Sequence, residues 1–446
     1  MKNRLVILGA GESGVGTALL ANQKGFDVFV SDMGSIKDNS KQELINAEIG
    51  FEEGRHSEKL ILNADEIVKS PGIPDSAPLI IKLKELEIPV ISEIEFASRY
   101  TSARKICITG SNGKTTTTLL TYHIFKEAGY NVGLAGNVGT SLARQLSNGI
   151  DYEWLIIELS SFQLDGMMKF KAEIAVLLNI TPDHLDRYDY NMQNYVDSKF
   201  RILQNQTQSD VFIYCMDDEI IEKEVKKRNI SAVCLPFSYE RQIEQGAYVS
   251  DQKINITLKN SKMGIFFHEL ALQGRHNIYN SMAASIAASV AQIKKEVIRQ
   301  CLANFKGVEH RLEKVLSVRG MEFINDSKAT NVNSTWYALE CIQSPIIWLA
   351  GGTDKGNDYA ALQSLAEEKV KVLICLGVDN KKLVEFFSGI IPTIVEVSTM
   401  EEAVKTAYQL GIKGDSVLLS PACASFDRFN NYEDRGNQFK EFVRNL

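Results

Sequence analysis

The stretch Lys105–Thr118 reads K-I-C-I-T-G-S-N-G-K-T-T-T-T, a pattern that can bind the phosphates of a nucleotide. Ile106–Ile108 predicts an apolar strand, and Gly110 and Gly113 allow the sharp turn that follows it. Lys114 then begins a helix, whose free N–H groups and positive dipole end attract phosphate. The pattern predicts an ATP site made by Gly110, Ser111, Asn112, Gly113, Lys114, Thr115 and Thr116.

The spacing of this loop differs from the usual phosphate-binding loop, which has four residues between its first glycine and the Gly-Lys pair. Here only Ser111 and Asn112 separate the two glycines. A solvated turn between a strand and a helix would not need Gly-Lys-Thr-Thr at the helix start, so we retain the prediction of phosphate binding. The Thr115 hydroxyl is then the expected magnesium ligand.

Two later strands end in residues suited to metal or proton chemistry. Glu158 closes the apolar run W-L-I-I-E, where a carboxylate is costly unless it meets a metal or hydrogen-bond donors. The next strand ends in N-I-T-P-D-H-L-D-R, which presents Asp183, His184 and Asp186. Open α/β sheets collect ligands at the carboxyl ends of their strands, so we expect these groups near the phosphate loop.

The N-terminal segment L-V-I-L-G-A-G-E-S-G places Gly9, Gly11 and Gly14 between a predicted strand and a predicted helix, and Asp32 ends the next strand. Read alone, this fingerprint favours NAD, but the same backbone geometry also binds the diphosphate of a nucleotide substrate. The spacing leaves both interpretations open. The segment K-S-P-G-I-P at Lys69–Pro74 either closes over the same ligand or forms a plain Pro-Gly turn.

Two further segments carry polar residues whose spacing does not decide their role. Lys199 lies on an amphipathic helix, where an exposed or snorkelling lysine is the ordinary interpretation. The segment G-R-H-N-I-Y-N-S begins a helix with His276, Asn277 and Asn280. These side chains could contact an adenine or a ribose, and they are equally consistent with capping of the helix.

Polar clusters follow or flank strands in the last third of the chain. They are E-H-R at Glu309–Arg311, N-D-S-K-A-T-N at Asn325–Asn331, G-G-T-D-K-G at Gly351–Gly356 and S-P-A-C-A-S-F-D-R-F at Ser420–Phe429. Polar residues at several strand ends are costly to assemble for folding alone. We therefore expect them to form one wall of a site that faces the ATP domain.

Strand and helix patterns alternate along all 446 residues, which predicts α/β architecture with largely parallel sheets. This length exceeds the roughly 250–300 residues at which a single core stops growing. A polar segment at Ser92–Arg104 and a change of composition at Phe305–Glu313 mark the expected boundaries. We predict a Rossmann-like N-terminal domain (residues 1–95), a central P-loop-type ATPase domain (96–306) and a Rossmann-like C-terminal domain (307–446).

The composition argues against several classes of protein. The formal net charge is −7 and no block of Lys and Arg occurs, so we expect no nucleic-acid partner. The seven scattered cysteines form no Cys-x-x-Cys pair, which is typical of reduced, buried thiols rather than disulfides or zinc ligands. With no charged leader and no apolar run of roughly 18 residues, we expect a cytoplasmic protein without membrane insertion.

The order of these motifs resembles the Mur ligase family over essentially the full chain. The family's loop T-G-[ST]-N-G-K-T-T matches Thr109–Thr116 and accounts for the short glycine spacing. Further agreement lies at G-N-x-G (136–139), E-x-S-S-F-Q-L (158–164), D-H-L-D-R (183–187), G-R-H-N (274–277), E-H-R (309–311) and D-S-K-A-T-N (326–331). The ending L-S-P-A-C-A-S-F-D-R-F, together with S-S-F-Q-L, resembles the branch of the family that adds D-glutamate.

The resemblance implies an ATP-dependent ligase that joins D-glutamate to UDP-N-acetylmuramoyl-L-alanine in peptidoglycan precursor synthesis, and we expect a monomer. It also implies that Lys199 is carbamylated and helps to hold one of two magnesium ions. The implied catalytic residues are Lys114, His184 and Lys199, and the implied metal ligands are Thr115, Glu158, His184 and Lys199. Further ATP contacts are Asn277, Arg311 and Asp326. The implied UDP-substrate contacts are Gly11, Ser13, Asp32, Ser70, Gly72, Asn137, Ser160, Gln163 and His184, and those to D-glutamate are Lys328, Thr330, Lys355, Ser425 and Phe426.

Three alternatives compete with this interpretation. Another ligase of the same fold, either a sister Mur ligase or a folylpolyglutamate synthase-like enzyme, should lack the S-P-A-C-A-S ending. An NAD-dependent dehydrogenase built on Gly9–Gly14 leaves Lys114, Glu158 and Lys199 unexplained. A non-enzymatic nucleotide-binding module needs no acid and metal cluster beside its phosphate loop.

Overall fold

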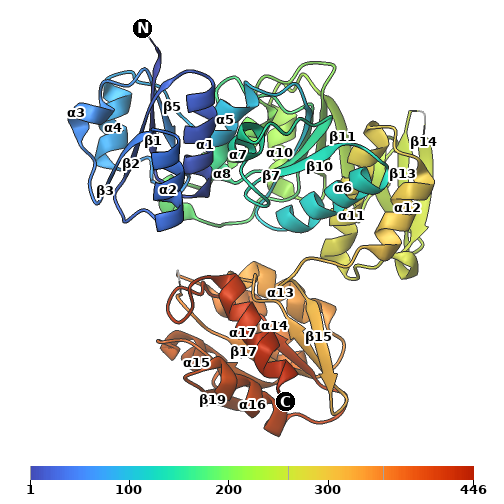
Figure 1. Ribbon diagram of the computed structural model, residues 1–446. Coiled ribbons are helices and arrows are strands. Elements are labelled where there is room, and N and C mark those ends of the chain that lie inside the picture. Colours follow the sequence, from blue (N-terminus) through green and yellow to red (C-terminus); the bar gives the residue numbers. More distant parts are fainter. Residues whose placement is uncertain (1, 260, 355) are drawn as a thin grey trace. The chain divides into compact units, whose positions relative to one another are not determined.

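The computed structural model describes residues 2–259, 261–354 and 356–446, which form two compact units. One unit comprises Met1–Leu270 and Asn277–Phe305, and the other comprises Ala271–His276 and Lys306–Leu446. Sheets flanked by helices make up both units (Figure 1). The α/β architecture predicted from the sequence is confirmed.

The first unit begins with a five-stranded parallel sheet in the Rossmann-like order β3-β2-β1-β4-β5. Its strands are β1 (Arg4–Leu8), β2 (Asp27–Asp32), β3 (Gly50–Glu53), β4 (Glu66–Lys69) and β5 (Val90–Ile91). Its helices are α1 (Glu12–Gln23), α2 (Asp38–Asn46), α3 (Glu58–Ile61) and α4 (Pro78–Glu85). Buried Val6, Leu8 and Ile67 of the sheet pack against Ile80 and Leu83 of α4, so the sheet keeps its loops at a fixed edge.

A nine-stranded sheet in the order β14-β13-β12-β11-β10-β9-β6-β8-β7 forms the rest of this unit. Its strands are β6 (Arg104–Thr109), β7 (Val132–Gly136), β8 (Trp154–Glu158), β9 (Ile174–Leu177), β10 (Val211–Cys215), β11 (Val233–Ser238), β12 (Gly246–Ser250), β13 (Lys253–Leu258) and β14 (Ser261–Phe266). Pairing is parallel from β7 to β12 and antiparallel through β13 and β14. The parallel part therefore directs all its carboxyl ends to one edge.

The helices around this sheet connect its strands and carry several predicted site residues. They are α6 (Lys114–Glu127), α7 (Leu142–Ser147), α8 (Ser161–Asp165), η1 (Leu185–Tyr188), α9 (Met192–Phe200), η2 (Arg201–Leu203), α10 (Glu219–Lys227), η3 (Phe267–Glu269), α11 (Arg275–Val290) and α12 (Lys295–Asn304). In the part of the chain that the structure describes, no helix combines the length and the apolar character that crossing a membrane requires.

The second unit is a six-stranded sheet in the order β15-β16-β20-β17-β18-β19, in which only β15 runs antiparallel. Its strands are β15 (Glu313–Val318), β16 (Met321–Asn325), β17 (Ile346–Ala350), β18 (Val370–Cys375), β19 (Thr393–Glu396) and β20 (Ser416–Leu419). Helices α13 (Val332–Cys341), α14 (Gln363–Lys369) and α15 (Lys381–Phe387), with η4 (Tyr359–Leu362), pack on one face, and α16 (Met400–Leu410) and α17 (Tyr432–Arg444) on the other. The resulting two-sided core holds the loops at its carboxyl edge.

Helix α5 (Glu93–Ser98) lies between the two sheets of the first unit along the chain, and two buried carboxylates fix it there. Glu95 Oε2 accepts hydrogen bonds from the N–H groups of Met168, Lys169 and Phe170 at 3.0, 3.1 and 2.8 Å. Glu93 Oε1 accepts one from the N–H of Ala143 at 2.6 Å. The predicted polar boundary segment is thus an anchored helix rather than an open linker.

Burial raises the pKa of Glu93 to about 7, and the nearby Glu12 carboxylate adds to the effect. Because the folded pKa exceeds the unfolded value of 4.5, the contribution of Glu93 to stability is complete below pH 4.5 and is lost as the pH rises through about 7. Between pH 5.5 and pH 8 this group should lower the unfolding free energy of the wild-type protein by about 2 kcal/mol, and we expect Glu93→Gln to abolish that decrease. Urea titrations at both pH values test this, with exposed Glu85→Gln as the control, and equal pH dependence in all three proteins would contradict it.

The cysteines conform largely to the predicted buried thiols. All seven are free, and five of them are buried. Cys234 is exposed and Cys341 is half-buried, so the prediction of burial is wrong for these two positions.

Candidate active site

The predicted phosphate, metal and histidine residues of the first unit come together because their strands are neighbours. Strands β9, β6, β8 and β7 are adjacent and parallel. The register pairs Ile108 with Glu158, and Glu158 with Gly136. The loops after these four strands therefore share one edge, as expected for ligand sites in parallel sheets.

The phosphate loop joins β6 to α6 and depends on its two glycines. Gly113 has φ +82°, and a Cβ there would lie 2.4 Å from Asn280 Oδ1, so a larger residue would be both strained and blocked. Asn179 holds the loop from the end of β9, because its Oδ1 accepts from the Asn112 N–H at 2.8 Å and its Nδ2 donates to the Asn112 carbonyl at 3.0 Å. Ser111 Oγ donates to the Thr181 carbonyl at 2.9 Å.

The first turn of α6 lies directly after this loop, where phosphate would meet free N–H groups. Lys114 Nζ donates to the carbonyls of Gly110 and Ser111, both at 2.8 Å. Thr115 and Thr116 are buried beside it. The helix start is also fixed from α11, since Thr117 Oγ1 donates to Asn280 Oδ1 at 3.1 Å and Asn280 Nδ2 donates to Asn277 Oδ1 at 3.2 Å. Asn277 is thus connected to the loop through Asn280.

Lys199 of α9 is 2 % exposed, so the interpretation of an exposed or snorkelling lysine is wrong. Its Nζ donates to the Gly110 carbonyl at 2.9 Å and lies 4.7 Å from the centre of the Tyr195 ring. Among the described residues no carboxylate forms an ion pair with this amine. Burial, and then the charge of Lys114, hold the pKa of Lys199 well below its usual value, which favours the neutral amine.

Glu158 lies at the end of β8 with one oxygen used and one oxygen available. Its Oε1 accepts from Asn137 Nδ2 at 3.0 Å, and Asn137 follows the end of β7. Its Oε2 is buried and has no hydrogen-bond partner among the residues that the structure describes. An unpaired buried carboxylate oxygen is costly unless a cation or a donor meets it, so Glu158 fits the predicted role of magnesium ligand. Within the described ranges, no group of three or more His, Cys, Asp or Glu side chains is placed to hold a metal. The predicted ligand set is not of this kind, because it includes the Thr115 hydroxyl and a modified Lys199.

His184 follows β9 in a left-handed conformation, with φ +52°, just before η1. Its ring packs edge-on against Phe162, with the ring centres 5.3 Å apart. Its Nε2 lies 3.7 Å from Asp183 Oδ1. The structure therefore brings His184 to the same sheet edge as the phosphate loop and Glu158.

The predicted UDP-substrate residues of the first sheet also gather at the carboxyl ends of its strands. Gly9 has φ +100°, and a Cβ on it would lie 2.8 Å from the Cβ of Ser70, so the loops after β1 and β4 touch. Asp32 fixes the glycine loop, because its Oδ2 accepts from the Ala10 N–H at 2.6 Å. Gly11 precedes α1, Ser13 lies in its first turn, and Gly72 follows Ser70 in the neighbouring loop.

Ser160 and Gln163 bind each other at the start of α8. The N–H of Gln163 donates to Ser160 Oγ at 3.3 Å, and the N–H of Ser160 donates to Gln163 Oε1 at 3.0 Å. This reciprocal capping box accounts for both side chains as helix-starting groups. A contact with the substrate stays a prediction for these two residues.

The second unit holds the predicted Arg311, Asp326 and amino-acid-binding residues. Asp326 is buried, where its Oδ2 accepts from Ser420 Oγ at 2.8 Å and burial raises its pKa to about 7. Arg311 has a buried Nε with no hydrogen-bond partner in the described part of the chain. Of the residues predicted to bind D-glutamate, Lys328 lies beside the Tyr432 ring, and the Thr330 N–H donates to the Lys328 carbonyl. Ser425 is buried and Phe426 is exposed. Lys355 lies outside the described residues.

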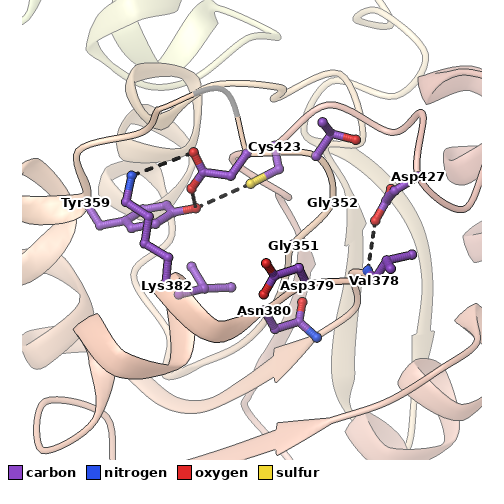
Figure 2. Close-up of a pocket in the computed structure, with 12 residues that line it drawn as sticks. Gly351, Gly352, Tyr359, Val378, Asp379, Asn380, Lys382, Cys423 and Asp427 are labelled. Atoms are coloured by element: carbon purple, nitrogen blue, oxygen red, sulfur yellow. Dashed lines mark hydrogen bonds and ion pairs between the residues drawn. The ribbon is translucent and has the colours of Figure 1, made fainter.

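A pocket of about 380 Å³ lies at the carboxyl edge of this sheet, between the loops after β17, β18 and β20 (Figure 2). Its charged lining is mainly acidic, with Asp354, Asp379 and Asp427 against Lys382. None of the described residues predicted to bind D-glutamate lines it. Because three carboxylates disfavour an anionic amino acid, we do not assign this pocket to D-glutamate.

Comparison with known proteins decides the family. Residues 3–92 match the family model "Mur ligase MurD-like, N-terminal domain", residues 108–288 match "Mur ligase middle domain", and residues 310–423 match "Mur ligase, glutamate ligase domain". A curated relative from Christiangramia forsetii is 56% identical over 446 residues and all of both chains. The chain belongs to the Mur ligase family.

Two curated relatives carry the same name. The Christiangramia forsetii relative and one from Bacteroides fragilis, which is 58% identical over 99% of this chain and 100% of its own length, are both named UDP-N-acetylmuramoylalanine–D-glutamate ligase. Solved Mur ligases share the fold at low identity. The alanine ligase MurC from Thermotoga maritima gives a TM-score of 0.61 at 17% identity over 99% of each chain. The MurF ligase from the same organism, solved with ADP, gives 0.62 at 14% over 100% of this chain and 98% of its own. The predicted three-domain Mur ligase fold is confirmed.

Proposed function

We propose that this chain is the ATP-dependent ligase that adds D-glutamate to UDP-N-acetylmuramoyl-L-alanine, a cytoplasmic step of peptidoglycan precursor synthesis. The observation that carries the proposal is the identity of 56–58% over the full chain to ligases of that name. The site supports it, because Lys114, Glu158 and Lys199 converge on one sheet edge, where a dehydrogenase would have no use for them. The Gly9–Gly14 fingerprint is then assigned to the UDP diphosphate rather than to NAD.

We assign three roles along the chain with the boundaries expected from its sequence. Residues 1–95 hold the UDP substrate, residues 96–306 bind ATP, and residues 307–446 bind D-glutamate. Asn137 and His184 position the muramoyl-alanine arm. Asn277, Arg311 and Asp326 contact ATP.

The proposed reaction forms an amide bond in two steps, the first of which brings two anions together. The L-alanine carboxylate attacks the γ-phosphorus of ATP, the bond to ADP breaks, and an acyl phosphate forms. The D-glutamate amine then attacks the acyl carbon, so that a C–N bond forms as phosphate leaves and the amine loses a proton. Lys114 would exchange the carbonyls of Gly110 and Ser111 for phosphate oxygens, and the free N–H groups of α6 would bind the same charge.

We infer that Lys199 carries a carbamate and that two magnesium ions bind at this edge. A buried neutral amine can attack carbon dioxide, forming a C–N bond and releasing a proton, and the product is a carboxylate analogue. The unpaired Glu158 Oε2 supports a cation at the same place. Magnesium held by Thr115, Glu158, His184 and modified Lys199 would neutralise the charge that builds on the transferred phosphoryl group.

The test measures phosphate release by the purified protein with ATP, magnesium and UDP-N-acetylmuramoyl-L-alanine. We expect release that depends on D-glutamate and is absent with L-glutamate, L-alanine or a diamino acid. Release with a different amino acid would assign the chain to a sister ligase of the same mechanism. Absence of release with every amino acid would overturn the proposed activity.

A further inference from the structure

Arg187 connects two loops that the proposed reaction uses. Its N–H donates to the His184 carbonyl at 3.0 Å, so both residues belong to one tight turn at η1. Its side chain extends from η1, which follows β9 of the nine-stranded sheet, to the loop after β4 of the first sheet. Both sheets belong to the same compact unit.

The guanidinium of Arg187 donates hydrogen bonds to three successive carbonyls of that loop. Its Nη2 donates to the carbonyls of Pro71 at 3.2 Å and Ile73 at 3.3 Å, and its Nη1 donates to that of Gly72 at 3.4 Å. None of its hydrogen bonds within the described residues goes to a carboxylate. Lys69 Nζ also donates to the Ile73 carbonyl, at 2.7 Å. Because these acceptors are backbone atoms, the contact fixes the path of the loop itself.

Phe162 gives Arg187 and His184 a common support. The guanidinium carbon lies 4.4 Å from the centre of the Phe162 ring, and the His184 ring packs on the same phenylalanine at 5.3 Å. Tyr188 stacks against Phe162 at 6.0 Å and 13°. A planar cation on an aromatic face keeps its orientation better than a flexible ammonium group would.

We propose that Arg187 is a positioning residue that clamps the Ser70–Pro74 loop to the His184 turn. The proposal rests on the proposed function, in which Ser70 and Gly72 contact the UDP substrate and His184 positions its reacting arm. Displacement of the loop moves the carbonyls that hold the guanidinium, and the guanidinium shares Phe162 with His184. Binding of the UDP substrate and placement of the arm are therefore coupled through one side chain.

The test compares Arg187→Ala and Arg187→Lys with the wild-type protein in steady-state kinetics. We expect Arg187→Ala to lower kcat/KM for the UDP substrate about 30-fold, through both KM and kcat, because three hydrogen bonds from a charged donor are lost. KM for ATP should change less than 2-fold. Arg187→Lys keeps the charge but not the fork, so it should recover only a small part of the loss.

The control is Arg104→Ala, which removes another arginine that stacks on an aromatic ring, Trp154, at 4.1 Å. Arg104 begins β6, at the end of the strand opposite the phosphate loop. Hydrogen exchange gives a readout that does not depend on turnover, and in Arg187→Ala we expect faster exchange in both 70–75 and 183–190. If the wild-type protein does not turn over the UDP substrate, the proposed function fails while the exchange result still decides the clamp. Kinetics and exchange in Arg187→Ala that match Arg104→Ala would overturn the clamp.

Discussion

Lys199→Ala should lower ligase activity about 10³-fold, and short carboxylic acids such as acetate should restore part of it. The wild-type side chain is buried, and its amine lies 2.9 Å from the Gly110 carbonyl of the phosphate loop. If the working form is a carbamate, the alanine variant lacks one carboxylate and leaves a cavity of matching size. A small added carboxylate can enter that cavity and supply the missing oxygens.

Lys105→Ala is the matched control for this experiment, because Lys105 is also buried and lies at the opposite end of β6. Its Nζ donates to the Ala103 carbonyl at 3.0 Å, so its loss should cost stability without any response to acetate. Native mass spectrometry at neutral pH should also show a wild-type mass increase of one carbon dioxide that Lys199→Ala lacks. Full activity of Lys199→Ala in the absence of added acids would refute the carbamate.

The sequence predicted the position of the phosphate loop and of Glu158 because both follow from local rules. A short apolar run followed by Gly110, or ended by Glu158, is enough to predict a strand and the place where it stops. Parallel pairing of β6 with β8 then places these ends together. Such residues can be predicted without knowledge of the packing of distant helices.

The depth of Lys199 could not be predicted in this way. Its spacing on α9 is that of an amphipathic helix, which predicts an exposed or snorkelling lysine. The structure buries it because α9 packs on α8 and brings the amine over the loop after β6. Only the resemblance to Mur ligases placed Lys199 among the candidate site residues, since its contact with Gly110 joins residues 89 positions apart.

Arg187 and Glu95 were missed for a related reason. Arg187 belongs to the D-H-L-D-R motif, yet its partners are backbone carbonyls, which leave no signature in the sequence. Glu95 lies in a segment that read as a polar boundary, although the residue is fully buried. A glutamate between Ile94 and Phe96 in a short helix is a weak signal of burial, and only the structure identifies the three N–H groups that it accepts.

Glu95→Gln should lower the free energy of unfolding by about 3 kcal/mol, the largest stability effect that we expect from a single isosteric change. Glu95 Oε2 accepts from the N–H groups of Met168, Lys169 and Phe170, and Oε1 lies 3.2 Å from Arg99 Nη2. An amide in the same place offers one weaker acceptor and turns an N–H₂ group toward a donor. Urea unfolding at pH 8 measures the change.

Glu93→Gln provides the comparison on the same helix, two residues away. Glu93 accepts a hydrogen bond from the Ala143 N–H, and burial raises its pKa to about 7, which disfavours its charged form. Glu95 instead accepts from three N–H groups. At pH 8 Glu93→Gln should therefore be neutral or stabilising, whereas Glu95→Gln destabilises. Equal destabilisation by both would mean that helix packing, rather than the count of N–H donors around each carboxylate, fixes α5 in the first unit.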